Sequence, residues 1–209
     1  MLEIAFLIPI KTTSLYNSSI YKLLKFFKDR VINNHIFNFY LGFDNGDKCL
    51  NEISLLQEFH SSNFTITIIE YKNNIQKGHL TKMWNILMKK SYSKNDYFYQ
   101  LGDDIIFHDY NFIDTYIKTL KISNDIGVTG LLQETKQSIL TQSFVSKKHY
   151  QIFKCLFPNE ILNWYCDNWI SKVYSYKNLY FPINTSFIEN NSIATGIRYI
   201  PNRDKDIYK

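Results

Sequence analysis

Residues 97–107 read YFYQLGDDIIF, and they determine how the rest of the chain can be interpreted. The segment begins as a short apolar run typical of a buried strand, and it then reaches Gly102, Asp103 and Asp104. Two adjacent carboxylates repel each other unless a cation or hydrogen-bond donors offset their charge. A divalent cation prefers such oxygen ligands, and a bound diphosphate can complete its shell. The segment predicts a metal site at a strand end; an ordinary surface turn is the alternative.

Strands and helices alternate on both sides of this segment. Apolar runs with strand character are followed by segments whose apolar residues recur at helical spacing, which predicts an α/β fold with a mainly parallel sheet and helices on both faces. After residue 141 the pattern changes, and it predicts a small antiparallel and helical C-terminal part with a strand-like tail from residue 178. The predicted strands are residues 3–8, 38–43, 64–70, 97–101, 127–132 and 142–145, and the predicted helices are residues 14–30, 48–60, 78–90, 110–120, 149–153 and 160–174.

Polar residues follow three of the predicted strands. They are residues 9–13 (PIKTT), residues 44–47 (DNGD) and residues 102–104 (GDD). In an open α/β sheet, ligands bind beyond the carboxyl ends of the strands. We therefore expect these three segments to share one edge of the sheet, although they lie far apart in the sequence.

Composition limits the classes of partner. The 209 residues carry a formal net charge of +5, and the lysines are scattered, which suits a nucleotide diphosphate better than a nucleic acid. Cys49, Cys155 and Cys166 show no spacing typical of a disulfide framework or a zinc site. No apolar run reaches the roughly 18 residues that span a bilayer, and the N-terminus lacks the features of a signal peptide. We expect a cytoplasmic protein with no membrane span and no nucleic-acid partner.

Residues 97–105 resemble the acidic motif of the GT-A glycosyltransferases, a nucleotide-sugar-dependent family built around a D-x-D signature. They are similar in particular to small GT-A domains encoded by large DNA viruses, for which the location would be the host cytoplasm. Gly102 stands where the first Asp of the signature would be. The resemblance implies a GT-A (Rossmann-like) sheet and an Mn²⁺ or Mg²⁺ ion bound by Asp104. It implies that Asp103 faces the donor or shares the metal, and it leaves open which carboxylate does which.

Other segments match this family in the same order. Residues 4–13 resemble its first strand and nucleotide loop, residues 44–47 resemble a turn whose first Asp meets the uracil ring, and residues 77–85 resemble the helix before the acidic motif. The alternative is that these are ordinary turn and surface residues. The resemblance implies a UDP-sugar donor bound by Pro9, Ile10, Lys11, Thr12, Asp44, Lys77, Gly78, Lys82 and Asp103.

Residues 163–169, NWYCDNW, place one carboxylate among aromatic side chains. A partly desolvated Asp has a raised pKa and can accept a proton from a hydroxyl group. In inverting GT-A enzymes a carboxylate in this region is the base, often in an E-D pair, and here Cys166 replaces the first acid. The resemblance therefore implies Asp167 as the catalytic base, with Trp164 and Trp169 stacking on an acceptor sugar. The alternative is an amphipathic helix with buried tryptophans and an exposed Asp.

These features together predict one domain over residues 1–209, with residues 1–132 binding the nucleotide-sugar and residues 133–209 forming the acceptor side. The predicted activity is that of a metal-dependent hexosyltransferase that moves a sugar from a UDP-sugar to a glycan or other hydroxyl acceptor, with inversion. A sugar-1-phosphate nucleotidyltransferase is one alternative, which the absence of glycine from residues 9–13 disfavours. The other alternative is a non-catalytic nucleotide- or carbohydrate-binding module.

Overall fold

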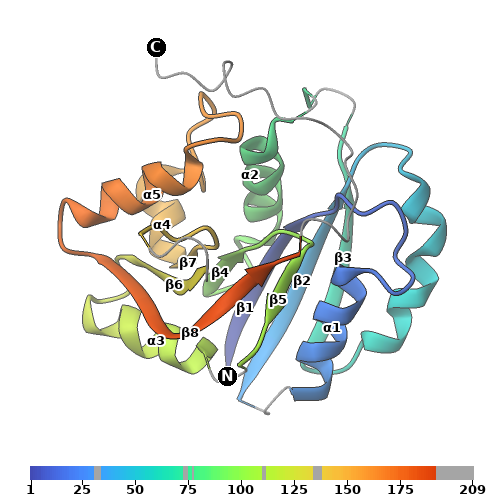
Figure 1. Ribbon diagram of the computed structural model, residues 1–209, viewed down its shortest axis with the longest axis horizontal. Coiled ribbons are helices and arrows are strands. Elements are labelled where there is room, and N and C mark those ends of the chain that lie inside the picture. Colours follow the sequence, from blue (N-terminus) through green and yellow to red (C-terminus); the bar gives the residue numbers. More distant parts are fainter. Residues whose placement is uncertain (31–33, 73–74, 77, 110–111, 134–137, 192–209) are drawn as a thin grey trace.

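A curled β-sheet runs through the computed structural model, which describes residues 1–30, 34–72, 75–76, 78–109, 112–133 and 138–191. Eight strands of these residues form the sheet in the order β3-β2-β1-β4-β7-β6-β8-β5 (Figure 1). The predicted α/β class with a mainly parallel sheet is confirmed. The strands are β1 (Leu2–Pro9), β2 (His35–Phe43), β3 (Phe64–Glu70), β4 (Tyr97–Gln100), β5 (Ile105–Phe107), β6 (Val128–Gln133), β7 (Phe144–Ser146) and β8 (Tyr180–Asn190).

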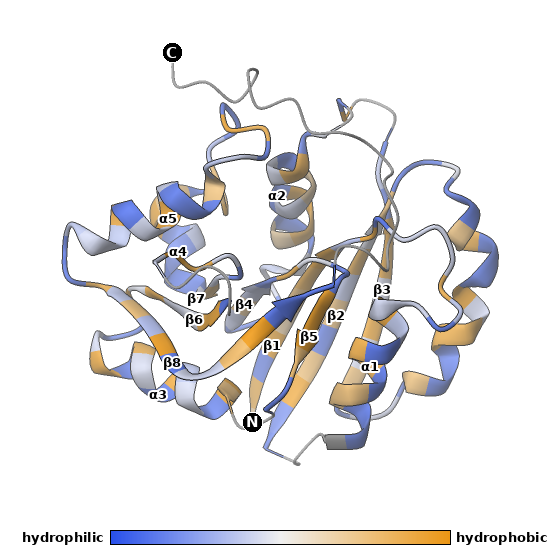
Figure 2. Ribbon diagram, in the orientation of Figure 1, coloured by the Kyte–Doolittle hydropathy of each residue, from blue (hydrophilic) through white to orange (hydrophobic). Residues whose placement is uncertain are grey.

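The first four strands of this order, β3, β2, β1 and β4, are all parallel. The central strand β1 is buried on both faces, with Ile4, Phe6 and Ile8 in one core cluster and Ala5 and Leu7 in the other. A strand segment covered on both faces needs apolar residues at every position, which explains why residues 4–9 of β1 are a continuous apolar run (Figure 2). Since the four strands run in parallel, their carboxyl ends meet at one edge.

The second half of the sheet is mixed. Strand β7 pairs antiparallel with β4 and β6, and β8 pairs parallel with β6 and antiparallel with β5. The three-residue strand β5 was not predicted, because so short a segment carries no recognisable period. It curls back over the first helix, where the Phe107 ring lies 5.6 Å from the Phe27 ring between centroids. The polypeptide between β4 and β5 therefore turns sharply, and Asp103 and Asp104 lie in this turn.

Helices cover both faces of the sheet. Side chains of α1 (Ser19–Arg30), the 3-10 helix η1 (Lys48–Phe59) and α3 (Phe112–Ile122) join the core cluster on one face. Those of α2 (Leu80–Ser91), α4 (Lys147–Phe153) and α5 (Cys166–Ser175) pack in the cluster on the other face. Among the helices of the described segments, none combines the length and the apolarity that a membrane span requires.

The bounds of the predicted helices differ from those observed by one or two residues in most cases, and three predicted helices differ more. The first begins at Ser19 instead of residue 14, because residues 10–18 form the loop that follows β1. The segment from residue 48 is a 3-10 helix. The last predicted helix begins at Cys166 instead of residue 160, because Tyr165 has a φ of 71°, a left-handed conformation that interrupts a helix. Trp164 consequently lies in the loop before α5.

Candidate nucleotide-sugar site

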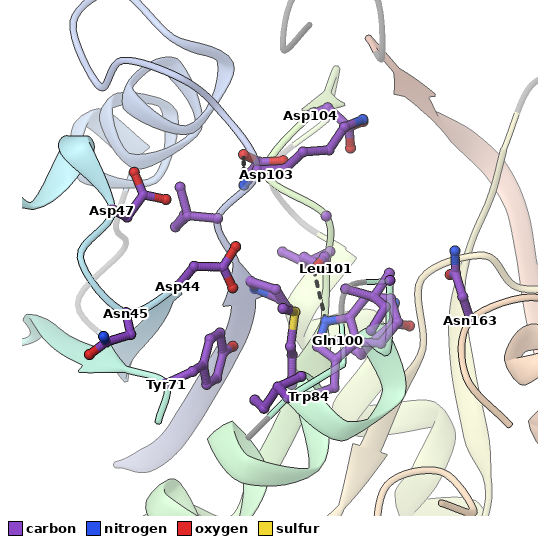
Figure 3. Close-up of a pocket in the computed structure, with 18 of the residues that line it drawn as sticks. Asp44, Asn45, Asp47, Tyr71, Trp84, Gln100, Leu101, Asp103, Asp104 and Asn163 are labelled. Atoms are coloured by element: carbon purple, nitrogen blue, oxygen red, sulfur yellow. Dashed lines mark hydrogen bonds and ion pairs between the residues drawn. The ribbon is translucent and has the colours of Figure 1, made fainter. Parts of the chain in front are cut away.

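A cleft of about 890 Å³ opens at the carboxyl ends of the parallel strands. Residues that follow β1, β2, β3 and β4 line one side of it, and residues from the loops around residues 141 and 163 line the other. The three polar segments predicted to share an edge of the sheet all contribute to this cleft (Figure 3). Its polar lining includes Lys11, Asp44, Asp47, Gln100, Asp103, Asp104, Gln142 and Asn163.

Asp103 connects the acidic segment to the loop after β1. Its Oδ2 accepts hydrogen bonds from the backbone N–H groups of Lys11 and Thr12, both at 2.7 Å. These bonds place Asp103 beside the loop that follows the carboxyl end of β1. Asp103 is only 2% exposed, and burial together with the charge of Asp104 raises its pKa to about 6. This carboxylate holds the loop in place with an oxygen that already has two donors.

Asp104 is buried in a different environment. Asp104 is 8% exposed, and the Lys11 Nζ lies 4.0 Å from its Oδ2. Burial raises the pKa of Asp104, and the positive charge of Lys11 lowers it. A buried carboxylate with one distant cation is costly unless further positive charge arrives. Asp104 is therefore the carboxylate that a bound divalent cation would stabilise most.

The donor set fits a metal that is held only in part by the protein. In the segments that the structure describes, no group of three or more His, Cys, Asp and Glu side chains lies close enough to hold an ion. The Asp103 Oδ2 is engaged by two amides, which leaves Asp104 as the better ligand. Mn²⁺ and Mg²⁺ accept one or two carboxylates with phosphate and water as the other ligands. The residues present fit such an ion.

The contacts around residue 102 explain why glycine occupies this position. A Cβ at this position would lie 2.5 Å from the Asp104 Oδ1, so a side chain here would displace that carboxylate. The preceding residue is also fixed, since the Trp84 indole Nε1 donates a hydrogen bond to the Leu101 carbonyl at 3.1 Å. Gly102, where the chain departs from the D-x-D signature, is thus the residue against which the Asp104 carboxylate lies.

Two glutamines that sequence reasoning missed support the same segment. The Gln142 Oε1 accepts a hydrogen bond from the Gly102 N–H at 3.2 Å, and the Gln100 Oε1 accepts one from the Ser143 N–H at 3.0 Å. Both side chains line the cleft. Nothing in the local sequence pairs positions some 40 residues apart, because β7 brings them together only in the folded sheet.

The turn after β2 separates its two carboxylates. The Asp47 Oδ1 accepts a hydrogen bond from the Cys49 N–H at 3.0 Å and caps η1, although Asp47 also lines the cleft. Asp44 is exposed and is directed into the cleft beside Tyr71, a residue that the sequence prediction did not include (Figure 3). Both carboxylates line the cleft, and Asp47 in addition caps η1.

The other predicted donor residues are placed as follows. Pro9, Ile10 and Lys11 line the cleft, and Gly78 lines it with a φ of 85° that favours glycine. Thr12 is a buried residue of the loop after β1, and its backbone N–H donates a hydrogen bond to Asp103. Lys82 lies on α2, outside the lining formed by the described residues. Lys77 lies outside the residues that the structure describes.

Of the three residues predicted for the acceptor side, one lines the cleft and two lie outside the lining formed by the described residues. Trp164 lines the cleft beside Asn163. Trp169 is partly buried, with its ring 5.5 Å from the Phe153 ring between centroids. Asp167 lies in the first turn of α5 and accepts a hydrogen bond from the Asn168 N–H at 2.9 Å. Within the described part of the chain, neither Trp169 nor Asp167 belongs to the cleft lining.

Solved structures share this fold, whereas no protein-family model and no curated protein matches the sequence. TarS of S. aureus superposes with a TM-score of 0.67 at 11% identity over 91% of this chain and 37% of TarS, and its residues 1–349 are also known with UDP. The mannosyltransferase PcManGT of Pyrobaculum calidifontis, solved with GDP-Man and Mn²⁺, gives 0.65 at 10% identity over 90% of this chain and 56% of that one. Glucosyl-3-phosphoglycerate synthase of Mycobacterium tuberculosis, solved with Mn²⁺, UDP and phosphoglyceric acid, gives 0.58 at 7% identity over 90% of this chain and 70% of that one.

These neighbours are nucleotide-sugar glycosyltransferases of the GT-A fold, and the likeness shows that the present chain has the same fold. The chain spans 37% of the full TarS chain and 56% of the mannosyltransferase, so much of each neighbour has no counterpart in these 209 residues.

Proposed function

We propose that this chain is a metal-dependent glycosyltransferase of the hexosyltransferase type that takes its sugar from a UDP-sugar. The observation that carries the proposal is the buried pair Asp103 and Asp104, which lies at the carboxyl edge of a GT-A sheet and lines the cleft. The ligands of the structural neighbours support it, because UDP, GDP-Man and Mn²⁺ are bound by proteins of the same fold. Residues 1–132 would bind the donor, and residues 133–209 would form the acceptor side.

Asp104 would hold Mn²⁺ or Mg²⁺ together with the donor diphosphate. When bound, the ion supplies positive charge where negative charge develops on the departing nucleoside diphosphate. Asp103 keeps the loop after β1 in register through its two backbone hydrogen bonds. Lys11, near Asp104, adds a further positive charge at the same end of the cleft.

The nucleoside would lie along the edge of the sheet toward β2. The exposed carboxylate of Asp44 can accept a hydrogen bond from the N3–H of uracil, and the loop of Pro9, Ile10 and Lys11 can pack against the base. The choice of uracil is part of the proposal, since the neighbours include one bound to UDP and one bound to GDP-Man.

The proposed reaction is a direct displacement. The acceptor oxygen forms a bond to the anomeric carbon, the bond from that carbon to the diphosphate oxygen breaks with its electron pair, and a base takes the acceptor proton. We assign the base to Asp167, which lies outside the cleft lining formed by the described residues and follows the cleft residue Trp164 by three positions. Trp164 would stack on the glycan acceptor, with Trp169 behind it. With the base opposite the leaving group, the anomeric configuration inverts.

A panel of UDP-, GDP- and CMP-sugars with Mn²⁺ tests this function. We expect UDP to be released from a UDP-hexose in the presence of Mn²⁺ and not in EDTA, measured by ³¹P NMR with and without a sugar acceptor. Preference for a GDP- or CMP-sugar would refute the choice of donor. Tight binding of UDP-sugars without any release or transfer would instead indicate a non-catalytic binding module.

A further inference from the structure

Tyr71 is a buried tyrosine of the cleft lining whose hydroxyl oxygen has no hydrogen-bond partner among the residues that the structure describes. The residue is 3% exposed. A buried hydroxyl left unpaired destabilises a folded protein, so most buried polar groups are paired. An unpaired group at a cleft wall is therefore a candidate for pairing with a ligand.

The backbone around Tyr71 fixes the position of the ring. Its N–H donates a hydrogen bond to the Phe43 carbonyl at 2.8 Å, which continues the pairing of β3 with β2. The ring lies against Gly42, where a Cβ would be 1.9 Å from the Tyr71 hydroxyl oxygen. The Gly42 carbonyl in turn accepts a hydrogen bond from the Ile10 N–H at 2.7 Å. Gly42 thus gives the ring room and ties it to the loop after β1.

Tyr71 and Asp44 present complementary hydrogen-bonding groups. Burial and the neighbouring charge of Asp44 raise the pKa of Tyr71 well above its ordinary value, so the phenol keeps its proton at neutral pH. Figure 3 shows the two side chains together on the wall of the cleft that faces Asn163. A donor beside an acceptor matches a base edge that carries a carbonyl next to a ring N–H, as in uracil or guanine.

The position of Tyr71 and Asp44 along the sheet, relative to the acidic pair, also suits a nucleobase. The order β3-β2-β1-β4 puts Tyr71 and Asp44 at the ends of β3 and β2, while Asp103 and Asp104 follow β4. With strands about 4.8 Å apart, two to three spacings place the acidic pair on the order of 10–15 Å from these two residues. A nucleoside diphosphate spans a similar length from its diphosphate to its base.

We infer that the Tyr71 hydroxyl donates a hydrogen bond to a carbonyl of the donor's nucleobase while Asp44 accepts from the adjacent ring N–H. Tyr71 is then a specificity-determining residue of the nucleotide site. The inference rests on the proposed function, since it requires that the cleft bind a nucleoside diphosphate. A tyrosine that only fills the core makes no such hydrogen bond to the nucleobase. A nucleobase-binding tyrosine and a core tyrosine therefore differ in how removal of the hydroxyl group changes the melting temperature and the nucleotide affinity.

The test is Tyr71→Phe, with Tyr40→Phe as the matched control. Tyr40 belongs to the same core cluster, and its hydroxyl accepts a hydrogen bond from the Asn95 side chain at 3.1 Å. Removing an unpaired hydroxyl should leave the melting temperature of free Tyr71→Phe unchanged or higher, while its affinity for UDP with Mn²⁺ falls roughly tenfold or more. Its affinity for inorganic pyrophosphate with Mn²⁺ should stay the same. Tyr40→Phe should lower the melting temperature and leave UDP affinity unchanged.

A second variant and a second nucleotide sharpen the result. Gly42→Ala places a methyl group against the Tyr71 hydroxyl, so it should also weaken UDP binding. The preference of the wild type for UDP over CDP should narrow in Tyr71→Phe. Wild-type UDP affinity in Tyr71→Phe, or an equal loss for UDP and pyrophosphate, overturns the inference alone. If the wild type binds neither probe with Mn²⁺, the proposed function fails and the inference fails with it.

Discussion

Asp103 accepts two backbone hydrogen bonds at 2.7 Å, whereas the Asp104 Oδ2 lies 4.0 Å from the Lys11 Nζ. The sequence predicts a carboxylate pair at a strand end, and the resemblance leaves their roles open. The hydrogen bonds distinguish the two carboxylates, because the amides of Lys11 and Thr12 in the loop after β1 donate to Asp103. We therefore propose Asp103 as the residue that positions the loop and Asp104 as the metal ligand.

At this scale the first prediction concerns Asp104→Asn. The change keeps the shape of the side chain and removes its charge, so UDP binding with Mn²⁺ should weaken by about 1.5–3 kcal/mol, the value of one charge-assisted contact. The fold should persist, since a buried charge with little pairing is removed. Calorimetry of UDP with Mn²⁺ measures the change. Asp114→Asn, at a surface carboxylate of α3, is the control. Wild-type affinity in Asp104→Asn would place the metal elsewhere.

The second residue-scale prediction concerns Asp167→Asn. If Asp167 is the base, donor affinity should remain close to that of the wild type, and turnover should fall by about 10²–10⁴-fold. Both quantities are measured on the same variant, because loss of rate alone does not distinguish a base from a structural residue. A parallel loss of melting temperature, or a product with retained anomeric configuration by NMR, would remove Asp167 from this role.

At the scale of elements, the loop after β1 is held at both ends by acidic side chains. Asp103 binds its beginning, and farther along the Glu52 Oε2 accepts hydrogen bonds from the Ser14 hydroxyl at 2.9 Å and from the N–H groups of Leu15 at 2.6 Å and Tyr16 at 3.2 Å. These bonds, that of Leu15 foremost, lower the pKa of Glu52. Helix η1 thus fixes the loop that lines the nucleotide end of the cleft.

Glu52→Gln should loosen this loop. An amide oxygen accepts more weakly than a carboxylate, so we expect UDP affinity with Mn²⁺ to fall by roughly fivefold and the melting temperature to change little. Glu58→Gln is the matched control, because Glu58 lies on the same η1 and accepts from the Tyr21 hydroxyl instead of from the loop. Equal UDP affinity in Glu52→Gln and wild type would show that the loop needs no such support.

Elements were predictable where a period extends over several residues. The apolar run in β1, the alternation of β3 and the helical spacing of α2 and α3 appear directly in the sequence. The three-residue strand β5 and the late start of α5 at Cys166 do not. The first carries too few residues for a pattern, and the second depends on the left-handed conformation of Tyr165, which the sequence does not specify.

At the scale of the whole molecule, the parallel order of β1 to β4 explains why much of the site could be anticipated. Three polar segments after parallel strands must meet at one edge, and in the structure they do. The contributions of Gln142, Asn163 and Asn190 to the cleft could not be anticipated, because they depend on how the second half of the chain packs beside the first. The sequence pattern after residue 141 carries too little regularity to show that packing.

The most direct measurement is the position of manganese in crystals of the protein grown with UDP and Mn²⁺, found by anomalous scattering. We predict one strong peak within coordination distance of the Asp104 carboxylate, with the UDP diphosphate as a further ligand and the uracil beside Asp44. This outcome would establish the donor site from which the proposed transfer follows. A manganese peak away from Asp104, or UDP bound outside the cleft, would contradict the account.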